Sequence, residues 1–354
     1  MGKKGTVVLR VEKEIHDRQS PATKERAGWD RFGFLPSAEG CQFQGGAIEP
    51  VTNYEDVKKW VQEHLYHENL LAQRGSAFER GSAFEPGILF PPKAWKQVHD
   101  PATDEPLGVV PGSERPSLLH RVPTSHYLHL DGVADLMAAR ESAAGFVTKI
   151  IGFLYDAPTQ FHDWWFDGPT SIATQNLYPT QALLKDFASH AYAIWQNWAR
   201  ENQQLMISAL HMHGRAPGHQ WYWERFAWEY TVTDACYKIA DSLWPGRFRV
   251  KGKPKKTLPH GERIKLMCSE FRLRFGIEED SWVNFAVCLR NELIHQARWC
   301  NAQPSTKSSD EALRAPRFLH KLNQRLITGL LGYQNTFIAS GWLTLSNASF
   351  DKRK

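Results

Sequence analysis

Three residues whose side chains suit RNA cleavage stand close together in the sequence. The segment from Cys288 to Ala297 reads CLRNELIHQA and contains Arg290, Asn291 and His295. A neutral imidazole accepts the proton of a 2′-hydroxyl, and an imidazolium returns a proton to the leaving 5′-oxygen. A guanidinium stabilises the charge that develops on a phosphate, while an amide orients the histidine or the phosphate. These three residues therefore predict a ribonuclease site that needs no metal ion.

The spacing alone is not specific, because Arg-x4-His occurs three times in this chain. The copies that begin at Arg115 and Arg121 each contain a proline, so neither is expected to be helical. Only the copy from Arg290 to His295 lies in a strongly helical pattern. That context, together with Asn291, distinguishes it from a chance arrangement.

The two faces of this helix differ in polarity. At about 100° per residue, one stripe is apolar and consists of Trp282, Phe285, Ala286, Leu289, Leu293 and Ala297. Asn284, Asn291, His295 and Arg298 lie roughly opposite, and Arg290 falls between the faces. A histidine that only fills a core would be expected on the apolar stripe. The alternative for His295 is a solvated surface histidine without a role.

A basic run precedes the motif and contains no acidic residue. It comprises Arg247, Arg249, Lys251, Lys253, Lys255 and Lys256. Such a run attracts phosphate backbones through charge neutralisation and counterion release. We expect it to contact RNA together with Arg298. The alternative is a solvated loop whose charge serves only solubility.

The chain of 354 residues divides by texture into an N-terminal mixed part and a C-terminal helical part. The predicted fold class is α+β overall, with a C-terminal all-α bundle. We expect a mixed α+β domain over 1–130, which is a candidate sensor or regulatory domain. A helix and connector follow over 131–180, and a helical nuclease domain follows over 181–354. Expected helices cover 54–73, 133–155, 181–213, 220–244, 262–275, 281–300 and 310–331, and short strands cover 6–12 and 341–345.

Composition is that of an ordinary globular protein, at 42% hydrophobic and 23% charged residues with a net charge of +5. Eight of the 14 tryptophans fall from Trp195 to Trp299, which predicts a large core there, with base stacking or a partner interface as the alternative. The five cysteines show no CxxC spacing, and no secretion signal or membrane-spanning stretch is visible, so a cytoplasmic protein is expected. No acidic or His/Cys cluster has ligand spacing. His211 and His213 point in different directions on a helix, and no metal or cofactor is expected.

The RNELIH segment resembles the Arg-Asn-x3-His signature of the HEPN superfamily. The segment from Arg225 to Trp244 is similar to the helix of that family that carries an acidic residue. Asp234 matches this acid best and Glu229 second. The segment HGERIKLMCSEF, residues 260–271, is similar to the helix that precedes the motif. The resemblance covers residues 181–335.

The resemblance implies a HEPN-like helical bundle that pairs as a homodimer and unites two Arg/His sets in one cleft. It implies a metal-independent endoribonuclease that leaves a 2′,3′-cyclic phosphate. His295 would be the acid/base, Arg290 would hold the phosphate, and Asn291 and Asp234 would orient the site. The expected setting is antiviral defence, as a toxin or abortive-infection effector that cuts RNA such as tRNA, with a phage-derived trigger or an antitoxin as partner.

Two other functions compete with this hypothesis. One is a non-catalytic HEPN-like module that binds RNA, nucleotides or a protein. A complete set of Arg290, Asn291 and His295 argues against it, since a degenerate module has no need to keep all three. The other is a structural helical bundle in which His295 is an ordinary surface residue.

Overall fold

The computed structural model describes residues 23–59, 61, 88–89, 95–99, 106–111, 123–164, 172–173, 180–219, 221–250, 253–304, 309–341 and 350. In these ranges an antiparallel sheet packs against helices, so the predicted α+β class is confirmed. The expected strand 6–12 lies outside the described residues, as does most of strand 341–345. Of the helix expected over 54–73, residues 54–59 and 61 are described and are helical.

The main sheet has five strands, with β7 at its centre. Its order is β2 (Cys41–Phe43), β3 (Gly46–Pro50), β7 (His126–Leu130), β1 (Asp30–Gly33) and β8 (Gln160–Phe161). All neighbours pair antiparallel, and Leu128 of β7 lies opposite both Asp30 and Ile48. One side of the sheet joins the main core through Phe32, Ile48 and Leu128. A smaller cluster that includes Tyr127, Tyr54 and Val57 forms separately.

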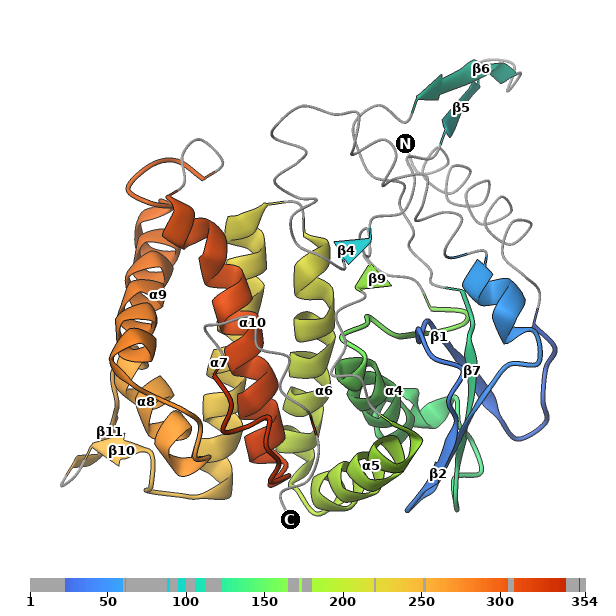
Figure 1. Ribbon diagram of the computed structural model, residues 1–354, viewed down its shortest axis with the longest axis horizontal. Helices are drawn as coiled ribbons and strands as arrows, with labels where there is room; N and C mark the ends of the chain where they lie inside the picture. Colours follow the sequence, from blue (N-terminus) through green and yellow to red (C-terminus); the bar gives the residue numbers. More distant parts are fainter. Residues whose placement is uncertain are drawn as a thin grey trace.

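Helices α4 to α10 extend from one side of the sheet (Figure 1). They are α4 (Ala143–Leu154), α5 (Gln181–Gln196), α6 (Arg200–Arg215), α7 (Tyr222–Leu243), α8 (His260–Glu270), α9 (Ile277–Gln296) and α10 (Asp310–Leu330). Helices α4 and α5 contact strands β7 and β2, and α4 then contacts α6. Helix α7 lies between α6 and α10 and also contacts α8 and α9, so it is the central helix of the bundle.

One hydrophobic core runs through both parts of the fold. It contains Phe32 and Leu128 from the sheet and Leu289 and Leu326 from the bundle. The division at residues 130 and 180 stays a prediction, because shared packing does not decide which parts fold independently. No described helix combines the length and apolar character that crossing a membrane would require.

Short strand pairs complete the described backbone. Strand β4 (Ile88–Leu89) pairs with β9 (Ile172–Ala173), and β5 (Trp95–His99) pairs with β6 (Pro106–Pro111). Strands β10 (Arg249–Val250) and β11 (Lys253–Thr257) form an antiparallel hairpin between α7 and α8. This hairpin carries much of the basic run.

The prediction of a single helix over 181–213 is wrong, since the structure has two helices there, α5 and α6, with a break between them. No glycine or proline marks the break. Asn197 ends α5 by donating its side-chain amide to the Ala193 carbonyl at 2.7 Å, a local bond that competes with helix continuation. The indole Nε1 of Trp195 donates to the Gln203 carbonyl at 3.2 Å, and Gln203 Nε2 donates back to the Trp195 carbonyl at 3.1 Å. The break therefore lets two helices bond across a buried tryptophan.

The start predicted for the helix over 133–155 is also too early. The structure has a 3₁₀ turn, η1 (Ala138–Glu141), and α4 starts only at Ala143. Arg140 of this turn is buried and donates from Nε and Nη2 to the two carboxylate oxygens of Asp30, each at 2.7 Å. A Cβ atom on Gly145 would lie 2.1 Å from the Arg140 carbonyl oxygen, so the close turn requires glycine there. This tertiary ion pair interrupts the helical pattern.

The remaining bundle helices agree with the sequence within a few residues. Helices α7 and α10 lie where helices were expected over 220–244 and 310–331. Helix α8 begins two residues earlier than expected, at His260, and α9 begins four residues earlier, at Ile277. Helix α8 ends before Arg272, whose φ of 56° is left-handed and stops the helix short of residue 275.

We predict that His126 makes folding depend on pH. Its side chain is fully buried, with ring contacts to Phe32 and Tyr54, and burial lowers its pKa to about 3. The folded-state pKa lies below the unfolded-state value near 6.5, so above about pH 6.5 His126 is neutral in both states and the free energy of unfolding is at its full value. As the pH falls from there toward 3, the free energy of unfolding decreases by about 1.4 kcal/mol per pH unit. Denaturant unfolding between pH 7 and 4 measures the slope.

The variant His126→Gln should reduce this pH slope. The matched control is His129→Gln, which changes a half-buried histidine of the same strand and should keep the slope of the wild type. An equal slope in His126→Gln and wild type would show that His126 is not the group responsible.

Candidate functional site

Helix α9 presents the motif, and local interactions define both of its ends. At its start, the Glu279 carboxylate accepts the Gly276 amide at 2.9 Å, and Glu278 and Asp280 add negative charge at the positive end of the helix dipole. At its end, Ala297 takes a left-handed conformation with φ 52° and donates its amide to the Glu292 carbonyl. His295 therefore stands in the last turn, next to a defined stop.

The structure brings the three predicted motif residues together. Arg290 Nη1 donates to Asn291 Oδ1 at 3.1 Å and lies 3.0 Å from His295 Nε2. Asn291 and His295 are exposed and Arg290 is half-buried. The guanidinium thus bridges the amide and the imidazole on an accessible surface.

The predicted faces of the helix are largely correct. Ala286 and Leu289 are buried, and Trp282, Phe285 and Leu293 pack against the core. Asn284, Asn291, His295 and Arg298 are exposed. Ala297 was wrongly placed in the apolar stripe, because it is exposed and ends the helix.

Residues of α7 and α8 lie behind Arg290. Its guanidinium carbon is 6.0 Å from the centre of the Tyr230 ring, a cation–π distance. Asp234, one turn further along α7, pairs through Oδ1 with His260 Nδ1 at 3.3 Å. The His260 and Tyr230 rings are 5.8 Å apart. Three helices therefore contribute to one polar group of side chains.

The charges of this group act on one another. Burial lowers the pKa of His260; Asp234 opposes this effect, and Arg290 and Arg263 add to it. Burial also raises the pKa of Tyr230, and Arg290 counteracts part of that rise. The hydroxyl of Tyr230 is buried and has no hydrogen-bond partner among the described residues. The arrangement provides a cation, an accessible imidazole and a second histidine paired with a carboxylate.

The second candidate for the family's acid lies elsewhere. Glu229 is adjacent to Tyr230 in sequence but points into the centre of the bundle, where its exposure is 1%. Asp234 is the acidic residue that accompanies Arg290. The structure therefore separates the two candidates into different surroundings.

The structure places all of the predicted RNA-binding residues except Lys251. Arg247 forms an ion pair with Glu270 of α8, and Arg298 is exposed just beyond α9. Arg249 lies in β10, and Lys253, Lys255 and Lys256 lie in β11. Lys251 lies outside the described residues. Their contact with RNA stays a prediction.

A second cluster of titratable side chains lies in the bundle core. Glu229 accepts from both imidazoles, with Oε2 3.0 Å from His213 Nδ1 and Oε1 2.7 Å from His320 Nδ1. His320 Nε2 lies 2.9 Å from Asp156 Oδ1. Asn323 Nδ2 donates to Glu229 Oε2 at 2.7 Å. Helices α6, α7 and α10 therefore meet at one carboxylate, and the turn after α4 joins them through His320.

The paired charges shift the pKa values within this cluster. Burial alone would raise the pKa of Glu229, but His213 and His320 outweigh this effect and lower that pKa to about 2. Burial lowers the pKa of His320, but Asp156 and Glu229 outweigh it and raise that pKa well above its usual value.

The structure brings together a His and acid cluster that no ligand spacing in the sequence indicated. Asp156, His213 and His320 each offer one ligand atom within 4.8 Å of the others. The three come from segments far apart in the sequence, so no local spacing revealed them. His211 does point away from His213, as expected, and lines a separate small pocket.

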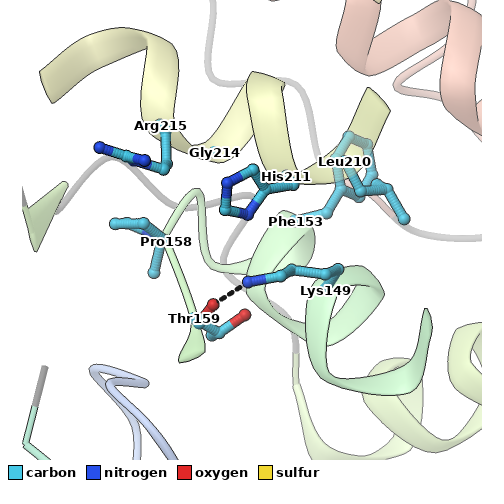
Figure 2. A pocket seen from close by; sticks show the side chains of 9 residues that line it. Lys149, Phe153, Pro158, Thr159, Leu210, His211, Gly214 and Arg215 are labelled. Carbon is cyan, nitrogen blue, oxygen red and sulfur yellow. Dashed lines mark hydrogen bonds between the residues drawn. The ribbon is translucent and has the colours of Figure 1, made fainter. Parts of the chain in front are cut away.

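Figure 2 shows this pocket, with Lys149 on one side and His211 and Gly214 on the other. Lys149 donates from Nζ to the Thr159 carbonyl, and burial together with Arg215 lowers its pKa to about 7. Gly214, next to His213, forms part of the opposite wall. Phe153 lines the pocket and also lies 5.7 Å from the His213 ring, so pocket and cluster share a wall.

Sequence reasoning missed two residues near the motif. His260 begins α8, and its partner Asp234 was already a candidate, but nothing local joins the two. Tyr230 stands four residues before Asp234, so helical spacing would have placed both on one face. The pairing of His260 required the tertiary structure.

We predict opposite shifts of the His260 pKa in two variants. Asp234→Asn should lower it further, because the carboxylate that favours the imidazolium is lost. Arg290→Gln should raise it, because a repelling cation is removed. Histidine titration by NMR measures both shifts, and Gln296→Ala, at an exposed position on α9, is the control. Equal His260 pKa values in all variants would show that these side chains do not act on one another.

Comparisons with protein-family models, curated proteins and solved structures found no match to this chain. The HEPN resemblance therefore stays a prediction carried by the motif. The geometry around Arg290 provides the remaining argument for function.

Proposed function

We propose that the chain is a metal-independent endoribonuclease whose site is centred on Arg290, Asn291 and His295. The observation that carries the proposal is the contact of one guanidinium with both other motif residues, at 3.1 Å and 3.0 Å, on an exposed face. The proposed setting is antiviral defence or toxicity toward the host cell, with RNA such as tRNA as substrate.

The reaction is a transesterification. The 2′-oxygen attacks the adjacent phosphorus, the bond to the 5′-oxygen breaks, and a 2′,3′-cyclic phosphate and a 5′-hydroxyl remain. His295 takes the 2′-hydroxyl proton, and His295 in its imidazolium form supplies a proton to the 5′-oxygen. Arg290 holds the phosphate through a charge-assisted contact, while Asn291 orients it and Asp234 orients His260.

A second copy of the chain would complete the site. In an isologous pair the same surface of each protomer meets its counterpart, so two His295 side chains share one cleft. Ile294, beside His295, leaves 58% of its surface exposed, an apolar side chain that a partner would cover. Cys288 is exposed and stands on the same side of α9 as His295. This face is therefore the proposed dimer interface.

We predict that purified protein cleaves RNA in EDTA and leaves 2′,3′-cyclic phosphate ends. His295→Ala should lower the rate by about 10²–10⁴-fold, because proton transfer is lost. Arg290→Ala should lower it by a comparable factor through loss of phosphate stabilisation. Gel electrophoresis of cleaved tRNA and total RNA, with analysis of the product ends, measures both effects.

The controls separate chemistry from folding. Gln296→Ala changes a neighbouring exposed residue and should keep full activity, while circular dichroism in EDTA verifies that each variant stays folded. An RNA with 2′-O-methyl groups should resist cleavage, since it has no 2′-hydroxyl. RNA binding without cleavage by folded wild type would favour the non-catalytic module instead.

We predict that a short bis-maleimide joins two copies of the chain through Cys288. Cys41, Cys236 and Cys268 are buried and Cys300 is half-buried, which leaves Cys288 as the exposed thiol. Denaturing gels should show a covalent dimer of wild type that is lost in Cys288→Ser and kept in Cys300→Ser. If the wild type stays monomeric on such gels at every protein concentration, this face is not the interface.

A further inference from the structure

One carboxylate holds two histidines in the same orientation. Both oxygens of Glu229 are engaged, one at each imidazole Nδ1. A carboxylate accepts hydrogen bonds, so each Nδ1 carries a hydrogen. The Nε2 of His213 is then left with its lone pair, while the Nε2 of His320 faces the Asp156 carboxylate and donates to it until a cation displaces its proton. The rings stack with centres 4.1 Å apart and planes at 14°, which places their Nε2 atoms on the same side.

The two Nε2 atoms differ in their hydrogen bonding. His213 Nε2 is buried without a hydrogen-bond partner among the described residues, and the residue is 1% exposed. His320 Nε2 lies 2.9 Å from Asp156 Oδ1. A buried nitrogen lone pair without a donor is unfavourable, and a bound cation would satisfy it.

We propose that Asp156, His213 and His320 bind a divalent transition-metal ion, with Glu229 orienting the two imidazoles. Metal-bound histidines almost always donate their other ring N–H to a carboxylate or carbonyl, which is the arrangement present here. Once the ion displaces the Nε2 proton of His320, two neutral imidazoles and one carboxylate form a donor set suited to Zn²⁺ and its neighbours in the first transition row. The ions Mg²⁺ and Ca²⁺ prefer sites made of oxygen atoms alone.

Charge and coordination number also fit such an ion. The carboxylates of Asp156 and Glu229 together balance a charge of +2. Gln324 Nε2 lies 3.4 Å from His320 Nε2, so exchange of its amide nitrogen and oxygen would offer a fourth ligand, and water is the other source.

A network of hydrogen bonds alone explains fewer of the observations. It accounts for His320, which lies between two carboxylates. It leaves His213 Nε2 buried and unsatisfied, although the chain keeps this imidazole oriented by Glu229. The metal site accounts for both histidines.

The ion would have a structural role, distinct from the proposed nuclease site. Its ligands come from the turn after α4, from α6 and from α10, and Glu229 connects them to α7. A bound ion would therefore cross-link four segments of the core. None of these residues belongs to the motif on α9.

The test uses the full chain, stripped with a chelator and then equilibrated with Zn²⁺ or Co²⁺. We expect one metal ion per chain after dialysis and a melting temperature raised by about 4 °C or more in excess Zn²⁺. Cobalt should give the visible absorption bands of a low-symmetry site with nitrogen ligands. Asp156→Asn keeps the shape of the side chain and should weaken binding at least tenfold, and Glu229→Gln should weaken it by about 10–100-fold.

His211→Gln is the matched control, because it changes a histidine of the same helix that is outside the cluster. It should bind metal as the wild type does, while His213→Gln should lose the site. If His213→Gln fails to fold, the cobalt spectrum of the wild type and the affinity of Asp156→Asn still decide. A wild type without stoichiometric metal or thermal shift would overturn the proposal, as would unchanged affinity in Asp156→Asn. His295→Ala should retain the metal, so loss of nuclease activity and loss of metal are separate results.

Discussion

The carboxylate of Glu229 is the interaction on which the bundle depends. Its side chain is 1% exposed, each oxygen accepts from one imidazole, and Oε2 also accepts from the Asn323 amide. A buried charge that loses one partner typically destabilises a fold by about 3–5 kcal/mol. Helices α6, α7 and α10 must therefore keep His213, Glu229 and His320 in register. Apolar packing alone is not directional and would tolerate small shifts of these helices.

Helix α7 transmits this constraint to the motif. Glu229 points toward α6 and α10, whereas the next residue, Tyr230, lies 6.0 Å from the Arg290 guanidinium carbon. Asp234 follows one turn later and pairs with His260 of α8. Because consecutive residues of one helix face the core cluster and the motif, α7 cannot rotate without disturbing both. The exposed site is thus positioned by a buried one.

The sequence predicted what local interactions determine. Helices α7, α9 and α10 follow from apolar periodicity, and the Arg290 group follows from spacing within one helix. The break between α5 and α6 depends on Asn197 and on bonds across Trp195, and the late start of α4 depends on the pairing of Arg140 with Asp30. The core cluster joins residues that are 91 and 164 positions apart. Contacts over such separations leave no periodic signal in a single sequence.

The histidines of the two clusters suit different tasks. An acid/base must exchange protons with substrate and solvent, and His295 is exposed, with Arg290 at Nε2 as its one described partner. His320 has both nitrogens engaged by carboxylates and is mostly buried, so a proton or a cation placed there is held in position. Burial and partners, and not residue type, decide which imidazole turns over protons and which holds helices together. The division supports the two proposals, which assign reaction chemistry to α9 and metal binding to the core.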